Sequence, residues 1–143
     1  MKISDDVLKT IKKHLGYSDG EIKLFSERPE NGDILAKAPV LMNKTIIFEV
    51  VESAGCNSGH RVGDRFYLDG SGNLLTKLNP KKICIFALSS LSGFVFAAHE
   101  LIYAGADPNG MRFKSTGCID VGVKCGGWGH IVLKCSVVDR DRS

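Results

Sequence analysis

The chain has 143 residues, of which 43% are hydrophobic and 24% are charged, and its formal net charge at pH 7 is +3. This composition is typical of one soluble globular domain and excludes a disordered tail, a collagen-like repeat and a polytopic membrane protein. The positive surplus is too small to indicate a surface that follows phosphates, so we expect no nucleic-acid partner.

Two short helices are predicted at the start of the chain. Apolar residues between positions 7 and 15 fall on one helical face, with Ser4 in place to cap the start and Gly16 to end the helix. Ser18 and Glu21 have the spacing of a capping box, which predicts a second helix directly after them.

A third helix is predicted over residues 34–38, with Asp33 as its cap, because Pro29 and the turn-forming residues after it are expected to end the second helix. This third helix either stops before Pro39 or continues to Met42. Helices of this length are not stable alone, so we expect them to pack on the rest of the chain or on another subunit.

Residues 1–44 are thus the helical N-terminal segment, and residues 45–143 are expected to form a single α+β core domain. β-Branched and aromatic residues predict strands over residues 45–52 and 65–69. The long apolar stretch at 81–104 predicts one helix with apolar residues all round, so we expect it to be buried on most sides.

Shorter strands are predicted at 111–114 and 118–123, a return strand opens at Leu74, and the clearest strand covers residues 131–138. The expected fold class is α+β: short N-terminal helices, then a small antiparallel sheet or partly open barrel packed on one central apolar helix. The short helices and the apolar helix carry more apolar surface than one copy easily hides, so we also expect a homo-oligomer.

The N-terminal sequence turns acidic at Asp5 and has no apolar stretch of the kind found in signal peptides, which predicts a cytoplasmic protein. Five cysteines in a chain that is not secreted are interpreted as thiols or metal ligands rather than as disulfides. Residues 83–98 carry no charge, but they are shorter than the roughly twenty residues of a membrane span, so we expect no membrane partner.

Two glycine-rich segments each pair a cysteine with a histidine, Cys56 with His60 and Cys125 with His130. Thiolate and imidazole are ligands that zinc and iron prefer, and glycines let a loop close tightly around an ion. These four residues would make a four-coordinate site, with Cys118 as a substitute ligand. The alternative is that the cysteines are small buried hydrophobic residues and the histidines are surface polar groups.

The same segments also support a reactive thiol. A neighbouring histidine can hold a cysteine as thiolate, and the N–H groups of a glycine-rich turn can stabilise an anion. In this interpretation Asp64 or Asp120 would orient the imidazole.

Further candidates for a ligand site lie outside the two Cys/His segments. His99 and Glu100 stand at the polar end of the apolar helix, where they either line a ligand pocket or serve as an ordinary helix terminus. Trp128 lies between glycines and is either a pocket lid, an oligomer anchor or a side chain packed over the end of the sheet. Cys84 and Cys135 are interpreted as core and structural residues.

The segment from Cys56 to Phe66 reads C-N-S-G-H-R-V-G-D-R-F and is followed by an apolar stretch with Cys84 and an Ala-Leu pair. This pattern resembles a family of small prokaryotic proteins of unknown function, found mostly in anaerobes, whose motif is C-P-x-G-H-x-V-G-D-x-F. The resemblance covers residues 46–106, and Asn57 stands where the family usually has Pro. It implies no activity, but it does imply one local feature made of Cys56, Gly59, His60, Gly63 and Asp64.

Two functions follow as alternatives. In the first, the loops at 56–60 and 118–130 build one site for a metal ion, zinc or iron, or for a small organic ligand, with Asp64 supporting the metal ligands. The protein would then be an enzyme or an accessory protein of anaerobic metabolism. In the second, the chain is a non-catalytic oligomeric subunit or interaction module whose cysteines only pack. The first alternative requires a fold that brings the two loops together.

Overall fold

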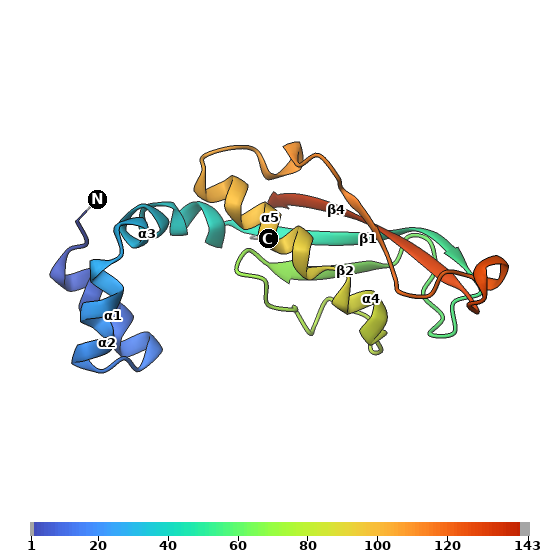
Figure 1. Ribbon diagram of the computed structural model, residues 1–143, viewed down its shortest axis with the longest axis horizontal. Coiled ribbons are helices and arrows are strands. Elements are labelled where there is room, and N and C mark those ends of the chain that lie inside the picture. The colour runs from blue at the N-terminus through green and yellow to red at the C-terminus, as the bar shows by residue number, and fades with distance from the viewer. Residues whose placement is uncertain (1, 141–143) are drawn as a thin grey trace. The chain divides into compact units, whose positions relative to one another are not determined.

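A computed structural model describes residues 2–140 of the chain (Figure 1). The chain divides into two compact units, Met1–Pro39 and Val40–Ser143. The first unit is helical and the second contains the sheet.

The predicted caps of the first two helices are confirmed. In α1 (Asp5–Leu15) the Ser4 hydroxyl accepts a hydrogen bond from the Val7 amide at 3.4 Å, and Gly16 ends the helix in a left-handed conformation. In α2 (Asp19–Glu27) the capping box is complete, because the Ser18 hydroxyl accepts from the Glu21 amide and the Glu21 carboxylate accepts from the Ser18 amide.

The third helix differs from the prediction at its start. Helix α3 (Pro29–Met42) begins at Pro29 rather than after Asp33, because a proline fits the first turn of a helix, where its missing N–H has no partner to lose. The Asn31 side chain donates a hydrogen bond to the Phe25 carbonyl at 2.7 Å and so closes the connection to α2. The helix continues past Pro39, which was one of the two alternatives.

The second unit is built on an open, antiparallel sheet with the strand order β2-β1-β4-β3, which confirms the α+β fold class. The strands are β1 (Lys44–Ala54), β2 (Arg65–Asp69), β3 (Ser115–Gly117) and β4 (His130–Asp139). The three strands predicted at 45–52, 65–69 and 131–138 are therefore confirmed. Long β1 and β4 pair over nearly their whole length at the centre of the sheet.

The strands predicted at 111–114 and 118–123 are wrong. The strand in this region is β3, three residues long, and the chain after it forms a loop that contains the short 3₁₀ helix η2 (Val123–Cys125). Alternating apolar residues favoured a strand here, but left-handed glycines at 122 and 126 bend the backbone away from the sheet. The return strand at Leu74 is reduced to a single bridge with Leu68.

The long apolar stretch forms two helical segments, α4 (Ile85–Ser89) and α5 (Ser92–Tyr103), instead of one uniform helix. Figure 1 shows α5 lying across one face of the sheet. By length and composition alone, residues 85–103 could cross a membrane. In the structure only 22% of the most apolar part of this stretch is buried. The prediction that it is buried on most sides is wrong, and Ile85, Phe86 and Phe96 are exposed.

The core lies between α4–α5 and the face of the sheet that they cover. Alternate residues of β1 and β4 point into it, and the burial of Phe48 and Leu133 is complete. The helices contribute small or branched residues to the same cluster, among them Ala87, Leu91 and Ala98.

Two asparagine side chains bind the strand backbone at the borders of the sheet, Asn79 on edge strand β2 and Asn109 on β4 beyond the end of β3. Asn79 accepts a hydrogen bond from the Tyr67 amide at 2.7 Å and donates one to the Tyr67 carbonyl at 2.9 Å. Asn109 does the same for Val137, at 2.8 and 2.7 Å. Each amide occupies the position that a further strand would take, which disfavours edge-to-edge pairing with another chain.

Candidate functional site

The two Cys/His loops lie side by side at one end of the sheet (Figure 1). The register of β1 and β4 pairs Ala54 with His130, so the first loop leaves β1 where the second loop enters β4. Their backbones touch there, because a Cβ atom on Gly129 would lie 2.6 Å from the Ala54 carbonyl oxygen and closer still to that of Gly55. Only glycine fits at position 129, and this contact holds the loops together.

The second loop is organised around the Asp120 carboxylate. Its two oxygens accept hydrogen bonds from the amides of Gly122 at 2.9 Å, Trp128 at 3.0 Å and Gly129 at 2.9 Å. These bonds, those from Gly129 and Gly122 first, hold the pKa of Asp120 below its ordinary value, and the nearby His130 lowers it further. The predicted role for Asp120 was to orient an imidazole, whereas its carboxylate orients the loop backbone.

Cys118 and His130 form the closest thiol–imidazole pair among the residues that the structure describes. The Cys118 Sγ lies 3.6 Å from His130 Nδ1 and accepts a hydrogen bond from the Ile131 amide at 3.4 Å. His130 Nδ1 also contacts the backbone carbonyl oxygen of Asp120. Because a carbonyl only accepts, this contact places a proton on Nδ1, and the Cys118 thiol donates to the same carbonyl oxygen at 3.7 Å.

His60 belongs to the interior instead. Its side chain is buried, with 4% of the residue exposed, and its ring meets that of Phe66 edge-on at 5.1 Å. Its Nε2 accepts a hydrogen bond from the Cys84 amide at 3.2 Å, which occupies the lone pair that a metal ion would need. Burial lowers the pKa of His60, with Lys82 acting in the same direction and Asp64 against it, so the neutral ring is favoured.

Cys84 packs against the core as predicted, but its contact with His60 was not foreseen. Desolvation raises the pKa of the Cys84 thiol, but the backbone of Ala87, the Ser58 side chain and the backbone of Phe86 outweigh it, and the pKa lies below its ordinary value. The position of Cys84 could have indicated this lowered pKa, because Cys84 directly precedes the first turn of α4. Amide groups of that turn are therefore within reach of its sulfur.

The remaining residues of the first loop have local roles. Cys56 is partly buried against the core, and its carbonyl accepts the Gly59 amide at 3.1 Å. The Asp64 carboxylate accepts the Arg61 amide at 2.8 Å and so closes the turn before β2. These two bonds close the turns of the first loop on either side of the buried His60.

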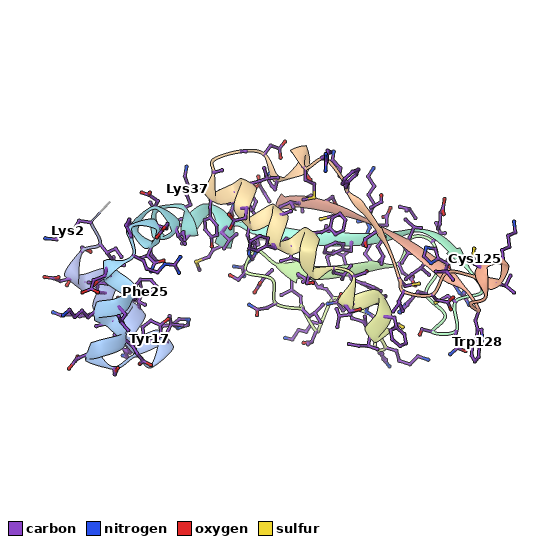
Figure 2. The ribbon with its side chains drawn as sticks, in the orientation of Figure 1. Lys2, Tyr17, Phe25, Lys37, Cys125 and Trp128 are labelled. Carbon is purple, nitrogen blue, oxygen red and sulfur yellow. The ribbon has the colours of Figure 1, made fainter. Side chains whose placement is uncertain are left out.

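The other predicted site residues lie apart from the Cys118–His130 pair or point to solvent. His99 bonds the Gly70 carbonyl through Nε2 at 2.7 Å and meets the Tyr103 ring edge-on, and Glu100 is exposed. Figure 2 shows Cys125 and Trp128 at the outer end of the second unit, and 78% of Trp128 is exposed. In this structure Trp128 is neither a lid over a pocket nor packed on the sheet.

The predicted four-ligand metal set is not assembled. Between residues 2 and 140 the structure contains no group of three or more His, Cys, Asp or Glu side chains that could hold a metal ion. All five cysteines are free thiols. Cys118 takes the place beside His130 that had been expected for Cys125, and Cys125 is exposed on η2.

A cavity of about 770 Å³ lies at the opposite end of the sheet from the Cys/His loops, where β1 begins and β4 ends. The Lys44 ammonium and the Asp139 carboxylate at its rim form an ion pair of 2.7 Å. The cavity shares no residue with the thiol-rich end. Its remaining lining residues are Met42, Thr45, Ile47, Tyr67, Asp69, Gly70, Ser71, Leu75, Leu78, Val138 and Arg140.

Comparison of the chain with protein-family models, with curated proteins and with solved structures finds no match.

Proposed function

We propose that the protein binds a small organic ligand through the Cys118 thiol, and that His130 holds this thiol in its reactive form. The observation that carries the proposal is the 3.6 Å contact between Cys118 Sγ and His130 Nδ1. Two further contacts support it: the Ile131 amide donates to the sulfur, and the Asp120 carbonyl favours a proton on the imidazole.

The ligand class that suits this pair is a small disulfide or another thiol-reactive molecule. In the simplest step the Cys118 thiol loses its proton to water, and the thiolate, next to the Nδ1–H group of His130, attacks one sulfur of the ligand disulfide. A new S–S bond forms as the ligand's own S–S bond breaks, and the departing thiolate takes up a proton from water. The step is balanced without a metal or any further oxidant, and it suits a reducing cytoplasm in which thiols stay free.

Site-resolved alkylation with iodoacetamide tests the proposal. We expect Cys118 to react about tenfold faster than Cys135, which is buried and whose pKa is raised to about 11 by desolvation. Mass spectrometry of partially labelled, non-denatured protein measures the rate at each cysteine. The exposed Cys125 is the matched control for accessibility, because among the described residues no histidine side chain bonds to it, and Cys118 should react faster than Cys125.

Two outcomes would count against this function. Labelling of Cys118 at or below the rate of Cys125 would mean that His130 does not activate the thiol. One zinc or iron ion per chain in protein purified without oxygen, lost in Cys118→Ser, would instead favour the metal site that the sequence predicted.

A second candidate, an interaction module that forms homo-oligomers, is favoured by the outer face of the helices. Ile85, Phe86 and Phe96 are 63%, 54% and 65% exposed on α4 and α5. We expect a second copy to cover this face with side chains, because Asn79 occupies the edge backbone at Tyr67 and Asn109 that at Val137. Light scattering on the full chain and on Phe96→Asp tests this: a dimer that becomes a monomer supports it, and a monomer in both cases refutes it.

A further inference from the structure

We propose that the tip loop, residues 119–129, inserts shallowly into the surface of an anionic lipid bilayer. This interaction surface is independent of the thiol chemistry proposed above. The expectation of no membrane partner concerns the apolar helix, whereas this proposal concerns the loop. Three features of the loop favour a lipid surface: its exposed side chains, its backbone and the charges around it.

The tip loop exposes apolar side chains at four positions and buries none of them. Ile119 is 70% exposed, Val121 59%, Val123 77% and Trp128 78%. Figure 2 shows Trp128 at the outer end of the second unit. An aromatic side chain with a polar N–H beside aliphatic ones is the combination that settles at a membrane–water interface.

Six backbone amides of the tip loop donate hydrogen bonds within the loop. The amides of Gly122, Trp128 and Gly129 donate to the Asp120 carboxylate. Those of Cys125 and Gly127 donate to the Gly122 carbonyl, and the Gly126 amide donates to the Val123 carbonyl. A loop that leaves water must satisfy its backbone groups internally, and six of the eleven amides of residues 119–129 already have acceptors within the loop.

The same backbone pattern leaves fewer donors for a protein partner. A protein interface forms about one hydrogen bond per 100–200 Å² of buried surface, and six of the eleven amides of residues 119–129 are already bonded within the loop. A lipid surface needs no directional bonds from the loop. It needs apolar side chains that reach below the headgroups and cations that stay at them.

The charges near the loop match an anionic surface. Lys124 lies on the tip loop, and Arg61 lies on the first Cys/His loop, which contacts it. Both side chains are exposed, and among the described residues neither forms an ion pair. Lys82, also exposed, is close enough to affect the pKa of His60. The carboxylates of Asp120 and Asp64 are directed at backbone amides instead of outward. Each free cation strengthens attachment to anionic lipid about fivefold.

Trp128 is the only tryptophan in the chain, so its fluorescence reports on the tip loop alone. The experiment uses the full chain with phosphatidylcholine vesicles, with and without phosphatidylglycerol. We expect the emission of Trp128 to shift to shorter wavelength with the anionic vesicles and to be quenched by brominated acyl chains. Co-sedimentation with the same vesicles measures the partition coefficient.

Two matched substitutions locate the contact. Val123→Asp should lower partition into anionic vesicles about tenfold or more, because it removes an inserted side chain and adds a charge that lipid repels. Val138→Asp places the same change on an exposed valine at the other end of β4, which is 44% exposed, and should leave partition unchanged. Lys124→Gln should lower it about fivefold, and only for the anionic vesicles.

Three results would overturn the proposal. The first is an unchanged Trp128 emission with both kinds of vesicle, and the second is equal partition of Val123→Asp and the unchanged protein. The third is a blue shift that grows with protein concentration in the absence of lipid, because a second copy would then cover the tip loop. Alkylation of Cys118 is measured without lipid, so failure here leaves the proposed thiol function to its own test.

Discussion

The two Cys/His loops contain the same reactive residue types and touch each other, yet the fold gives them different environments. His60 is 4% exposed, and its Nε2 accepts the Cys84 amide. His130 is only partly buried, and its Nδ1 lies 3.6 Å from the Cys118 sulfur. In the first loop the imidazole is therefore part of the packing, whereas in the second it remains available to a thiol.

The difference comes from where each histidine sits relative to the sheet. His60 turns under the covering helices and meets the Phe66 ring, so burial favours its neutral form. His130 opens β4 at the sheet's end, where its ring lies over Gly117 and Asp120 holds the loop around it. The spacing between a cysteine and a histidine in the sequence therefore does not predict the role of the histidine, which depends on how far its imidazole is buried.

The contact between the loops should be the most sensitive point of this arrangement. Gly129→Ala places a Cβ atom against the carbonyls of Gly55 and Ala54, and the backbone can yield only by breaking the pairing of Ala54 with His130. We expect the free energy of unfolding to fall by about 3 kcal/mol or more. Urea unfolding followed by far-UV circular dichroism measures it.

Gly93→Ala is the control for that substitution, because Gly93 lies within α5 and a Cβ atom there meets nothing within 4 Å. It should raise the free energy of unfolding by about 0.5–1 kcal/mol, since alanine is the better helix former. Equal effects of the two substitutions would show that the loops are not held together by the glycine contact.

Removing the buried histidine should have the next largest effect. His60→Ala leaves the Cys84 amide without its acceptor and opens a cavity beside Phe66. We expect a loss of about 2–3 kcal/mol from the free energy of unfolding. His60→Ala should also leave alkylation of Cys118 within about twofold of its original rate, and a larger drop would mean that the two loops act as one site.

Stability should depend on pH through the same residue. The pKa of His60 is lowered from 6.5 in the folded protein, mainly by burial, so the unfolded chain takes up a proton at a higher pH than the folded one. The free energy of unfolding should therefore fall as pH drops below 6.5 and level off once the folded protein is also protonated. Urea midpoints measured from about pH 8 to about pH 5 test this, and His60→Ala should flatten the slope.

Local patterns in the sequence predicted much of this fold. The Ser4 and Ser18 caps and the alternating strands at 65–69 and 131–138 depend on residues within one element, so propensity and spacing were sufficient. The third helix was misplaced because Pro29 can end one helix or begin another, and only the Asn31 bond to Phe25 decides between them.

The site was harder to predict because it depends on pairing between distant strands. No pattern near His130 predicts that Cys118, twelve positions away, becomes its partner in place of Cys125. That choice follows from the Asp120 carboxylate, which draws the amides of residues 122, 128 and 129 together and turns an apparent strand into a loop. The Cys84 contact of His60 likewise depends on how α4 lies on the sheet.

The smallest effect on stability should come with the largest effect on chemistry. His130→Ala removes a partly exposed ring, so the free energy of unfolding should fall by only about 1 kcal/mol. Alkylation of Cys118 should nevertheless slow about tenfold, because the thiolate loses the protonated Nδ1 beside it, while Cys125 keeps its rate. Rates at both cysteines come from a single mass-spectrometric time course. If alkylation slows at both cysteines, the loop has loosened and His130 is a structural residue like His60. If it slows only at Cys118, His130 activates the thiol, whereas His60 serves packing.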